Sequence, residues 1–326
     1  MMKLQCGARI GATAAALMML AGAAYAGSGQ PSPQQIGLQE PATEMMRTIV
    51  SFHNATTWLL VAITAFVLGL MLYVAVRFNE KANPVPSNFT HNATVEVLWT
   101  VIPVIVLLVI AVPSFRLLFA QYTYPKPDVT IKAIGNTWMW VHEYPDLGIK
   151  VDSNMITDED VVREALGNDK YKEKFGKITD DLALAKALYA ESKPLWEKRG
   201  EPRQLAVDNE IAVPVGKVVH VLVTSAADGV IHSWTIPSFG SRTQAVPGRI
   251  TSTWFRADKE GIYYGQCSVL CGKLHSSMPI AIRVVKQEAF DQWTAAVKAK
   301  DSKKAKAILK ATAEDTGAPK FAAVAN

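Results

Sequence analysis

Two long apolar stretches constrain the fold of this chain more than any other feature. Thr57–Val76 and Val97–Phe115 contain no charged residue, and each is long enough to cross the hydrocarbon core of a bilayer as a helix. Trp58 and Tyr73 lie near the ends of the first stretch, where amphipathic rings favour the membrane interface. Residues 53–120 are therefore expected to form a two-helix transmembrane hairpin, after which the chain returns to the side on which it began.

The N-terminus indicates which side that is. Residues 1–26 have the pattern of a cleaved signal peptide, with Lys3 and Arg9 near the start, an apolar middle and Ala24-Tyr25-Ala26 as the cleavage sequence. An uncleaved third membrane helix is the alternative, but the apolar run is short and rich in alanine and glycine. Cleavage would place segment 27–52 and all residues after the hairpin in the periplasm. The protein is then a multi-pass protein of the inner membrane with a periplasmic C-terminal domain.

After Pro127 the pattern changes to short β-type segments punctuated by glycine, proline and Asp-Gly, which predicts an all-β sandwich or barrel. The predicted strands are 129–134, 138–143, 204–207, 218–224, 230–236, 250–255, 261–265 and 280–285. A charged stretch rich in alanine, leucine and lysine, residues 157–203, predicts a helical insertion. A solvated surface insertion is the simpler interpretation, and a docking surface for a partner is the sharper one. The β-rich domain is assigned to residues 121–290. A C-terminal helix is expected to begin near residue 287, and residues 291–326 are assigned to the remainder of this helix and a tail.

One short loop carries an unusual set of side chains. Cys267, Cys271, His275 and Met278 follow one another closely, and His232 lies upstream in a strand-like segment. Thiolate, imidazole and thioether form a soft ligand set that suits copper better than calcium or magnesium. Two thiolates shared between two metal ions would leave one imidazole for each. Such an arrangement suits electron transfer.

Two simpler interpretations compete with copper. Two cysteines in an exported domain often form a disulfide, and zinc binds cysteine and histidine in many spacings. The third cysteine, Cys6, lies in the predicted signal peptide, so Cys267 and Cys271 would be the only ones in the mature chain. Structural zinc sites are normally closed by four cysteine or histidine ligands, and a thioether has no place there. The complete ligand set therefore favours copper over both alternatives.

The chain closely resembles the bacterial type of cytochrome c oxidase subunit II, a family of the haem–copper oxidases. The matching segments are Cys267-x3-Cys271-x3-His275-x2-Met278-Pro279, Gly229–Pro237, Ala245–Arg249, Gly261–Gln266, Trp138-Met-Trp140 with Glu143-Tyr-Pro145, and Val95-Glu96-x-x-Trp99-Thr100. The resemblance implies a cupredoxin-like sandwich. It also implies an enzyme subunit that accepts electrons from cytochrome c at a binuclear copper centre and passes them to haem in subunit I, where oxygen is reduced to water.

The resemblance also implies roles for individual residues. It makes Cys267 and Cys271 bridging thiolates and His232 and His275 terminal imidazoles. The weak axial ligands would be Met278 and the backbone carbonyl of Val269.

Two further residues match functional positions of the family. Trp138 matches the tryptophan at which electrons enter, although packing is the simpler role for a tryptophan. Glu96 matches a carboxylate at the mouth of a proton-uptake path. An acid in the first turn of a helix is equally accounted for by the helix dipole.

Two positions depart from the family. Val269 stands where the family has a glutamate whose side chain joins a magnesium site shared with subunit I, and Gln244 replaces an aspartate. Magnesium prefers oxygen ligands, so this metal is doubtful here.

Other function classes fit less well. The expected partners are subunits I and III, cytochrome c and the membrane. A copper-free quinol oxidase subunit II would lack the ligands that this chain has, and a membrane-anchored copper carrier would not need two bridging thiols. Nucleic acid is not expected as a partner, because the net charge is only +5 and the lysine-rich segments lack interleaved aromatic residues.

Overall fold

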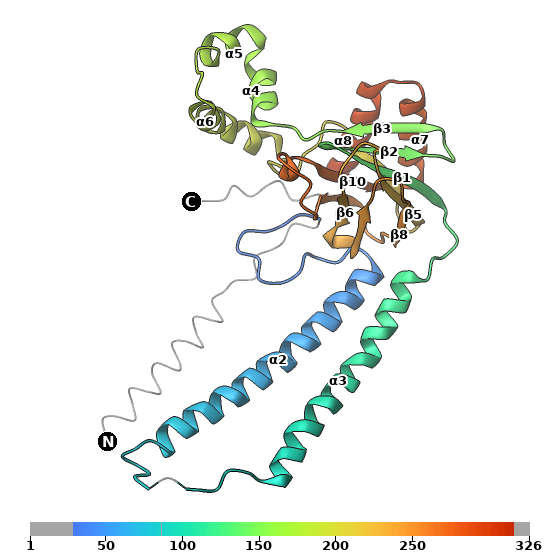
Figure 1. Ribbon diagram of the computed structural model, residues 1–326. Coiled ribbons are helices and arrows are strands. Elements are labelled where there is room, and N and C mark those ends of the chain that lie inside the picture. Colours follow the sequence, from blue (N-terminus) through green and yellow to red (C-terminus); the bar gives the residue numbers. More distant parts are fainter. Residues whose placement is uncertain (1–28, 86, 316–326) are drawn as a thin grey trace.

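The computed structural model describes residues 29–85 and 87–315, so the predicted signal peptide lies outside the described residues. Two long helices, α2 (Glu44–Arg77) and α3 (Ala93–Tyr122), extend from one end of a β-rich domain, as Figure 1 shows. Each contains an 18-residue stretch with a mean hydropathy of 2.7 and no buried residue, as expected for helices that cross a membrane. Both helices extend beyond the predicted apolar stretches, by about a turn or more at each end of α3.

The start of α2 is fastened to the β-domain. The Thr43 side chain caps the helix by accepting a hydrogen bond from the Met46 N–H, and its hydroxyl donates to the Phe239 carbonyl at 2.9 Å. Met46 is buried, and Arg47 pairs with Asp258 at 2.6 Å. The hairpin therefore holds the domain in a defined position relative to the membrane.

The domain itself is built from ten strands in the described part of the chain. These are β1 (Val129–Asn136), β2 (Met139–Tyr144), β3 (Ile149–Ser153), β4 (Ile211–Pro214), β5 (Val218–Ser225), β6 (His232–Ile236), β7 (Ser241–Ala245), β8 (Thr251–Arg256), β9 (Gly261–Gln266) and β10 (Pro279–Val285). Two short 3-10 helices, η1 (Pro237–Phe239) and η2 (His275–Ser277), lie between strands.

The strands form three sheets. The largest has the order β3-β2-β1-β5-β8, with β1 and β5 parallel, and the second has the order β4-β10-β9, with β4 and β10 parallel. The third is the antiparallel pair β6-β7. Alternate residues of β1 and β5 are buried, and one core of aromatic and branched side chains lies between the sheets. This confirms the expected cupredoxin-like sandwich attached to a two-helix hairpin.

Strands β6 and β9 approach each other closely at Gly265. A Cβ added at this position would overlap the Thr235 carbonyl oxygen and lie 2.5 Å from the Ile236 side chain. Only glycine allows the two strands to come this close. The approach brings the start of β6 beside the loop that follows β9.

The insertion over 157–203 is helical, as predicted. It contains α4 (Asp158–Leu166), α5 (Asn168–Phe175) and α6 (Asp181–Arg199), which enclose a small core of their own around Val162, Tyr171 and Leu188. The Thr157 side chain and Asp160 form a reciprocal capping box at the start of α4.

Some sequence predictions differ from the structure. The predicted strand 204–207 is a turn with one bridge, between Met155 and Val207, because the chain leaves the insertion there. The single C-terminal helix is two, α7 (Gln287–Lys298) and α8 (Ser302–Asp315), because Lys300 adopts a positive φ of 56°. Strands β3, β4 and β7 were not predicted.

Candidate metal centre

The loop with the soft ligands joins β9 to β10. Gln266 and Pro279 are paired across these antiparallel strands, so both ends of the loop are fixed by the sheet. Cys267 and Met278, the first and last candidate ligands, lie next to this pair. The loop is therefore a closed hairpin whose two termini are held on a rigid scaffold.

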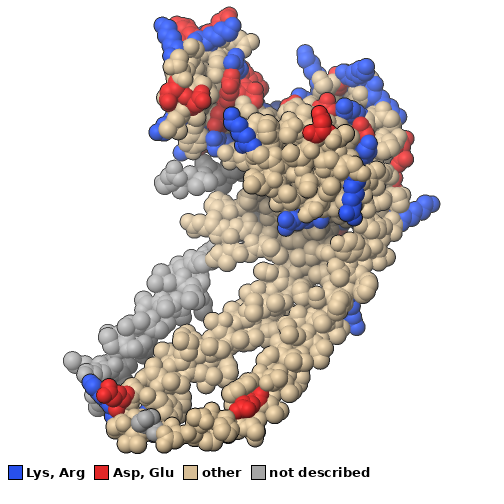
Figure 2. All heavy atoms as spheres, in the orientation of Figure 1, with Lys and Arg blue, Asp and Glu red and all other residues tan. Residues whose placement is uncertain are grey.

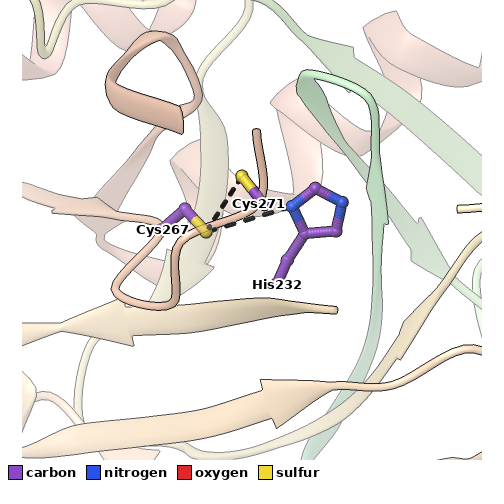
Figure 3. Close-up of side chains that lie close together, drawn as sticks. All are labelled: His232, Cys267 and Cys271. Atoms are coloured by element: carbon purple, nitrogen blue, oxygen red, sulfur yellow. Dashed lines mark hydrogen bonds between the residues drawn. The ribbon is translucent and has the colours of Figure 1, made fainter. Parts of the chain in front are cut away.

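His232 reaches the loop from β6. Its side chain is buried, and its ring packs over Gly135 of β1, where an added Cβ would lie 2.8 Å from the imidazole Cδ2. The Trp140 ring meets it edge-on, with centroids 6.0 Å apart. The contacts with Gly135 and Trp140 restrict the orientation of the imidazole, which is directed toward Cys267, as Figure 3 shows.

The two thiols are close together but not bonded. Their sulfur atoms are 3.8 Å apart, far beyond the length of about 2.05 Å of a disulfide. Both residues are buried, and the sulfur atoms and an imidazole nitrogen of His232 all lie within 4.8 Å of one another. Figure 3 shows the three side chains directed at the same point.

Each sulfur also has its own pair of neighbouring donors. Cys267 Sγ lies 3.9 Å from His232 Nδ1 and 3.2 Å from the Val269 carbonyl oxygen. Cys271 Sγ lies 3.4 Å from His275 Nδ1 and 3.6 Å from Met278 Sδ. The structure therefore brings together all six predicted metal-ligating positions: two thiols, two imidazoles, a thioether and a carbonyl.

This donor set fits copper. The sulfur and nitrogen donors are soft or intermediate, and the thioether and carbonyl are the weak axial ligands found in copper electron-transfer sites. His232 Nε2 is buried without a partner among the described residues, while Nδ1 faces the sulfur atoms. The geometry thus points one imidazole nitrogen at the site and leaves the other away from it.

The surroundings of Cys271 and His232 shift the pKa values of both side chains. Burial and the adjacent Cys267 raise the pKa of the Cys271 thiol to about 12. Burial and the charge of His275 lower the pKa of His232, so its imidazole is neutral at pH 7. Because a metal needs the thiolate and the neutral imidazole, binding must release a thiol proton but no proton from His232.

A hydroxyl network ties the loop to β6. Ser268 Oγ donates to Ser233 Oγ at 2.9 Å and lies 2.8 Å from Thr235 Oγ1. Ser233 Oγ in turn donates to the Thr243 carbonyl at 3.1 Å. These residues hold the two ligand-bearing segments together, and sequence reasoning missed them. Their only signal was a serine directly after each of two ligand residues, His232 and Cys267.

Trp138 lies directly on the loop. Its indole N–H donates to the Cys271 carbonyl at 3.1 Å, and its ring faces Gly272, where an added Cβ would lie 3.2 Å from it. Trp138 is only half-buried, unlike Trp140. Trp140 is fully buried and donates to the Met278 carbonyl at 3.1 Å, so it packs in the core behind the loop.

Two other predicted positions lie apart from this cluster. Glu96 is in the first turn of α3, at the end of that helix far from the β-domain (Figure 1). Its carboxylate accepts the Asn92 backbone N–H at 3.2 Å, as an acid does at the start of a helix. Gln244 is exposed on β7, where its backbone pairs with Ser233.

A second buried histidine lies near the site. His142 points into the core from β2, and its Nε2 accepts the Trp234 indole N–H at 3.4 Å. Burial lowers its pKa from 6.5 to about 3. The folded protein therefore keeps this imidazole neutral well below the pH at which the unfolded chain takes up a proton.

We predict that His142 makes the fold sensitive to acid. Between pH 6.5 and about 3 only the unfolded chain binds the proton, so stability decreases as the pH falls. At pH 5 this one residue should reduce the free energy of unfolding by about 2 kcal/mol relative to pH 7. His142→Gln should remove that part of the loss in guanidinium unfolding of the detergent-solubilised chain. His91→Gln, at an exposed histidine, is the comparison variant, and an equal slope in both variants would contradict the assignment.

Comparison with known proteins agrees with this geometry. Residues 31–117 match the family described as the transmembrane domain of cytochrome c oxidase subunit II, and residues 178–285 match its periplasmic domain. The probable cytochrome c oxidase subunit 2 of Rickettsia bellii is 41% identical over 82% of this chain and 86% of its own length. The chain belongs to the cytochrome c oxidase subunit II family.

Two further proteins are similar to this subunit II chain. Cytochrome c oxidase subunit 2 of Cereibacter sphaeroides is 40% identical over 81% of both chains. The crystal structure of the periplasmic domain of subunit II of cytochrome oxidase from Bradyrhizobium japonicum is 40% identical, covers 55% of this chain and 99% of its own, and superposes with a TM-score of 0.40. Subunit II is part of a haem–copper oxidase, an oxidoreductase complex of the membrane, and its family binds copper.

Proposed function

We propose that this chain is the subunit at which electrons enter its oxidase, taking them one at a time from cytochrome c and passing them to haem in subunit I. The observation that carries the proposal is the pair of unbonded, buried sulfur atoms 3.8 Å apart, each with an imidazole and a weak donor beside it. A pair of copper ions held there would supply a redox centre that takes up and releases one electron at a time.

The chain's own residues determine how such a centre is held. The thiolates of Cys267 and Cys271 and the imidazoles of His232 and His275 would hold the copper. The Met278 thioether and the Val269 carbonyl would be its weaker donors. These ligand groups are held in place by Gly135, Trp140 and the Ser233–Ser268 contact. Mutation of outer contacts of this kind typically lowers metal affinity by about 10–100-fold.

Trp138 is proposed as the contact between the donor and the site. Its half-exposed ring lies over the loop, and its hydrogen bond to the Cys271 carbonyl connects it directly to a ligand residue. An accessible indole at this position offers a π-system between the donor haem and the sulfur atoms. We therefore assign Trp138 to electron entrance and Trp140 to packing.

Replacing Trp138 tests the proposal. Trp138→Leu should keep both coppers, because no ligand is lost, but should slow reduction by cytochrome c by at least about tenfold, since a small change in donor position can cost more than that. Stopped-flow reduction of the purified oxidase measures the rate. Tyr124→Leu, at an exposed aromatic residue on the connection after α3, is a matched control. Equal rates in the two variants would refute the role of Trp138.

A copper-free quinol oxidase subunit II is not favoured, because every candidate side-chain ligand is present and lies beside one of the two sulfur atoms. A carrier of a single copper is also disfavoured, since it would not need two thiols aligned with two imidazoles. The role of Glu96 in proton uptake stays a prediction. Its contact with the Asn92 N–H gives it a structural role in any case.

We also propose that the magnesium site of the family is lost. Val269 keeps the carbonyl that faces Cys267 but has no carboxylate, and magnesium is bound by oxygen ligands. In oxidase from cells grown with manganese, EPR should show no bound Mn²⁺ signal, and Val269→Glu should restore one. A bound signal in the unmodified enzyme would contradict this proposal.

A further inference from the structure

A wide groove lies between the helical insertion and the C-terminal helices. We call it the insert groove: its walls are α4 and α6 on one side and α7 and α8 on the other, and its volume is about 1610 Å³. Figure 1 shows the helices of both walls at the end of the domain away from α2 and α3. None of the candidate copper ligands lines it.

The surface of the groove is apolar in part. Five of its lining side chains are apolar and only partly buried: Met155, Ile156, Leu195, Ile262 and Val297. They come from both walls and from the floor, which β9 contributes. A partner could therefore bury apolar surface along the groove.

The acidic groups of the groove are already engaged. Glu164 and Glu201 both pair with Arg199, and Glu210 makes a two-point pair with the buried Arg283. The remaining acids have partners too: Asp152 pairs with Lys150, Asp160 caps α4 and Asp208 accepts from the Asn154 N–H. Each of these carboxylates therefore already has a hydrogen-bond or ion-pair partner within the protein.

Apart from Lys150, which pairs with Asp152, the lysines of the groove have no ion-pair partner among the described residues. Lys198 of α6, Lys300, and Lys306 and Lys310 of α8 line it without an ion pair to any described residue. On α8 the lining positions 302, 305, 306, 309 and 310 form one helix face. The groove therefore combines an apolar surface with four lysines that have no ion-pair partner among the described residues. Figure 2 shows charged side chains of both signs gathered at this end of the molecule.

Size and position narrow the choice of ligand. The volume exceeds the 300–1,000 Å³ typical of small-molecule pockets, and the distance from the membrane-spanning helices argues against lipid headgroups. The groove-lining face of α8, from Ser302 to Lys310, extends over about 12 Å, because each helical residue advances the chain by about 1.5 Å. We propose that the insert groove is a docking site for an acidic, amphipathic segment of a partner protein outside the membrane.

A pair of synthetic peptides tests this on the intact oxidase in lipid nanodiscs. Both peptides are fluorescently labelled amphipathic helices with the same apolar face; one carries glutamates on its polar face and the other lysines. In fluorescence anisotropy the acidic peptide should bind, with an affinity that falls as salt is added. Absence of binding, or equal binding of the two peptides, would overturn the proposal.

Charge reversal locates the site. Lys300→Glu/Lys306→Glu/Lys310→Glu should weaken binding of the acidic peptide by at least about tenfold, because three attractions become repulsions. The matched control is Lys303→Glu/Lys304→Glu, on the same helix but outside the groove, which should leave binding within about twofold. Equal loss in both variants would show nonspecific attraction and refute the site.

The copper centre provides an independent check. Copper content and reduction by cytochrome c should be unchanged in both lysine variants, because the exposed lysines do not touch the candidate ligands. Lys300→Gln/Lys306→Gln/Lys310→Gln, which removes the charges without reversing them, should bind the acidic peptide with an affinity between those of the unmodified protein and the glutamate variant. Failure of the groove proposal would therefore leave the proposed electron-transfer function untouched.

Discussion

Cys271→Ser is expected to abolish the redox centre while leaving the fold intact. Cys271 Sγ is the shared neighbour of Cys267, His275 and Met278, so its loss removes the contact that unites the two halves of the site. Reduction by cytochrome c should fall by more than about 100-fold, beyond the 10–100-fold typical of changing only an outer contact. Metal analysis should find at most one copper in the isolated full-length chain.

Ser276→Ala is the matched control for this change. Ser276 lies in the same loop, in η2, and its side chain is exposed. It should keep copper content and reduction rate within about twofold of the unmodified protein. If Cys271→Ser retained two coppers and normal rates, the sulfur pair could not be the metal site.

The second large effect is expected at Gly265. In Gly265→Ala the new methyl group would overlap the Thr235 carbonyl, and a backbone oxygen cannot rotate away as a side chain can. Strands β6 and β9 would have to separate, which should lower the free energy of unfolding by about 3 kcal/mol. Guanidinium unfolding of the detergent-solubilised chain measures this loss.

The same substitution should also loosen the metal site. Strand β6 carries His232 and β9 leads directly into Cys267, so a separation of these strands moves one ligand away from the other. Copper should then dissociate faster on addition of a chelator. Gly37→Ala, at a glycine with open space around it, should change neither quantity. A loss of stability below about 1 kcal/mol at Gly265 would contradict the packing argument.

The ligand set could be predicted because it is local in sequence. Four ligand side chains lie within one loop and His232 lies in a nearby strand-like segment, so their chemistry indicated a shared metal site. The role of the Val269 carbonyl came from the family resemblance. The membrane hairpin was predictable for a similar reason, because an uncharged apolar stretch of sufficient length has few other structures open to it.

The supports of the site were not predictable, because they depend on distant contacts. Nothing near Gly135 in the sequence indicates that the His232 ring lies over it. The contact between Ser233 and Ser268 and the one between His142 and Trp234 likewise join segments far apart in the chain. Such pairs become visible only when the sheets are assembled.

Some local signals were present but missed. Strand β3 alternates buried Ile149 and Val151 with exposed Lys150 and Asp152, the pattern of a half-buried strand. The break between α7 and α8 was marked by Asp301, whose side chain accepts the Lys304 N–H and so starts a new helix. In contrast, β7 has no apolar alternation and is recognisable only from its pairing with β6.

The most direct test of the central claim is the copper content and EPR spectrum of the isolated full-length chain after copper loading. The account predicts two coppers per chain and a mixed-valence signal in which one unpaired electron is shared equally by both metal ions. One copper per chain with a mononuclear signal, or a Cys267–Cys271 disulfide in the active oxidase, would contradict it.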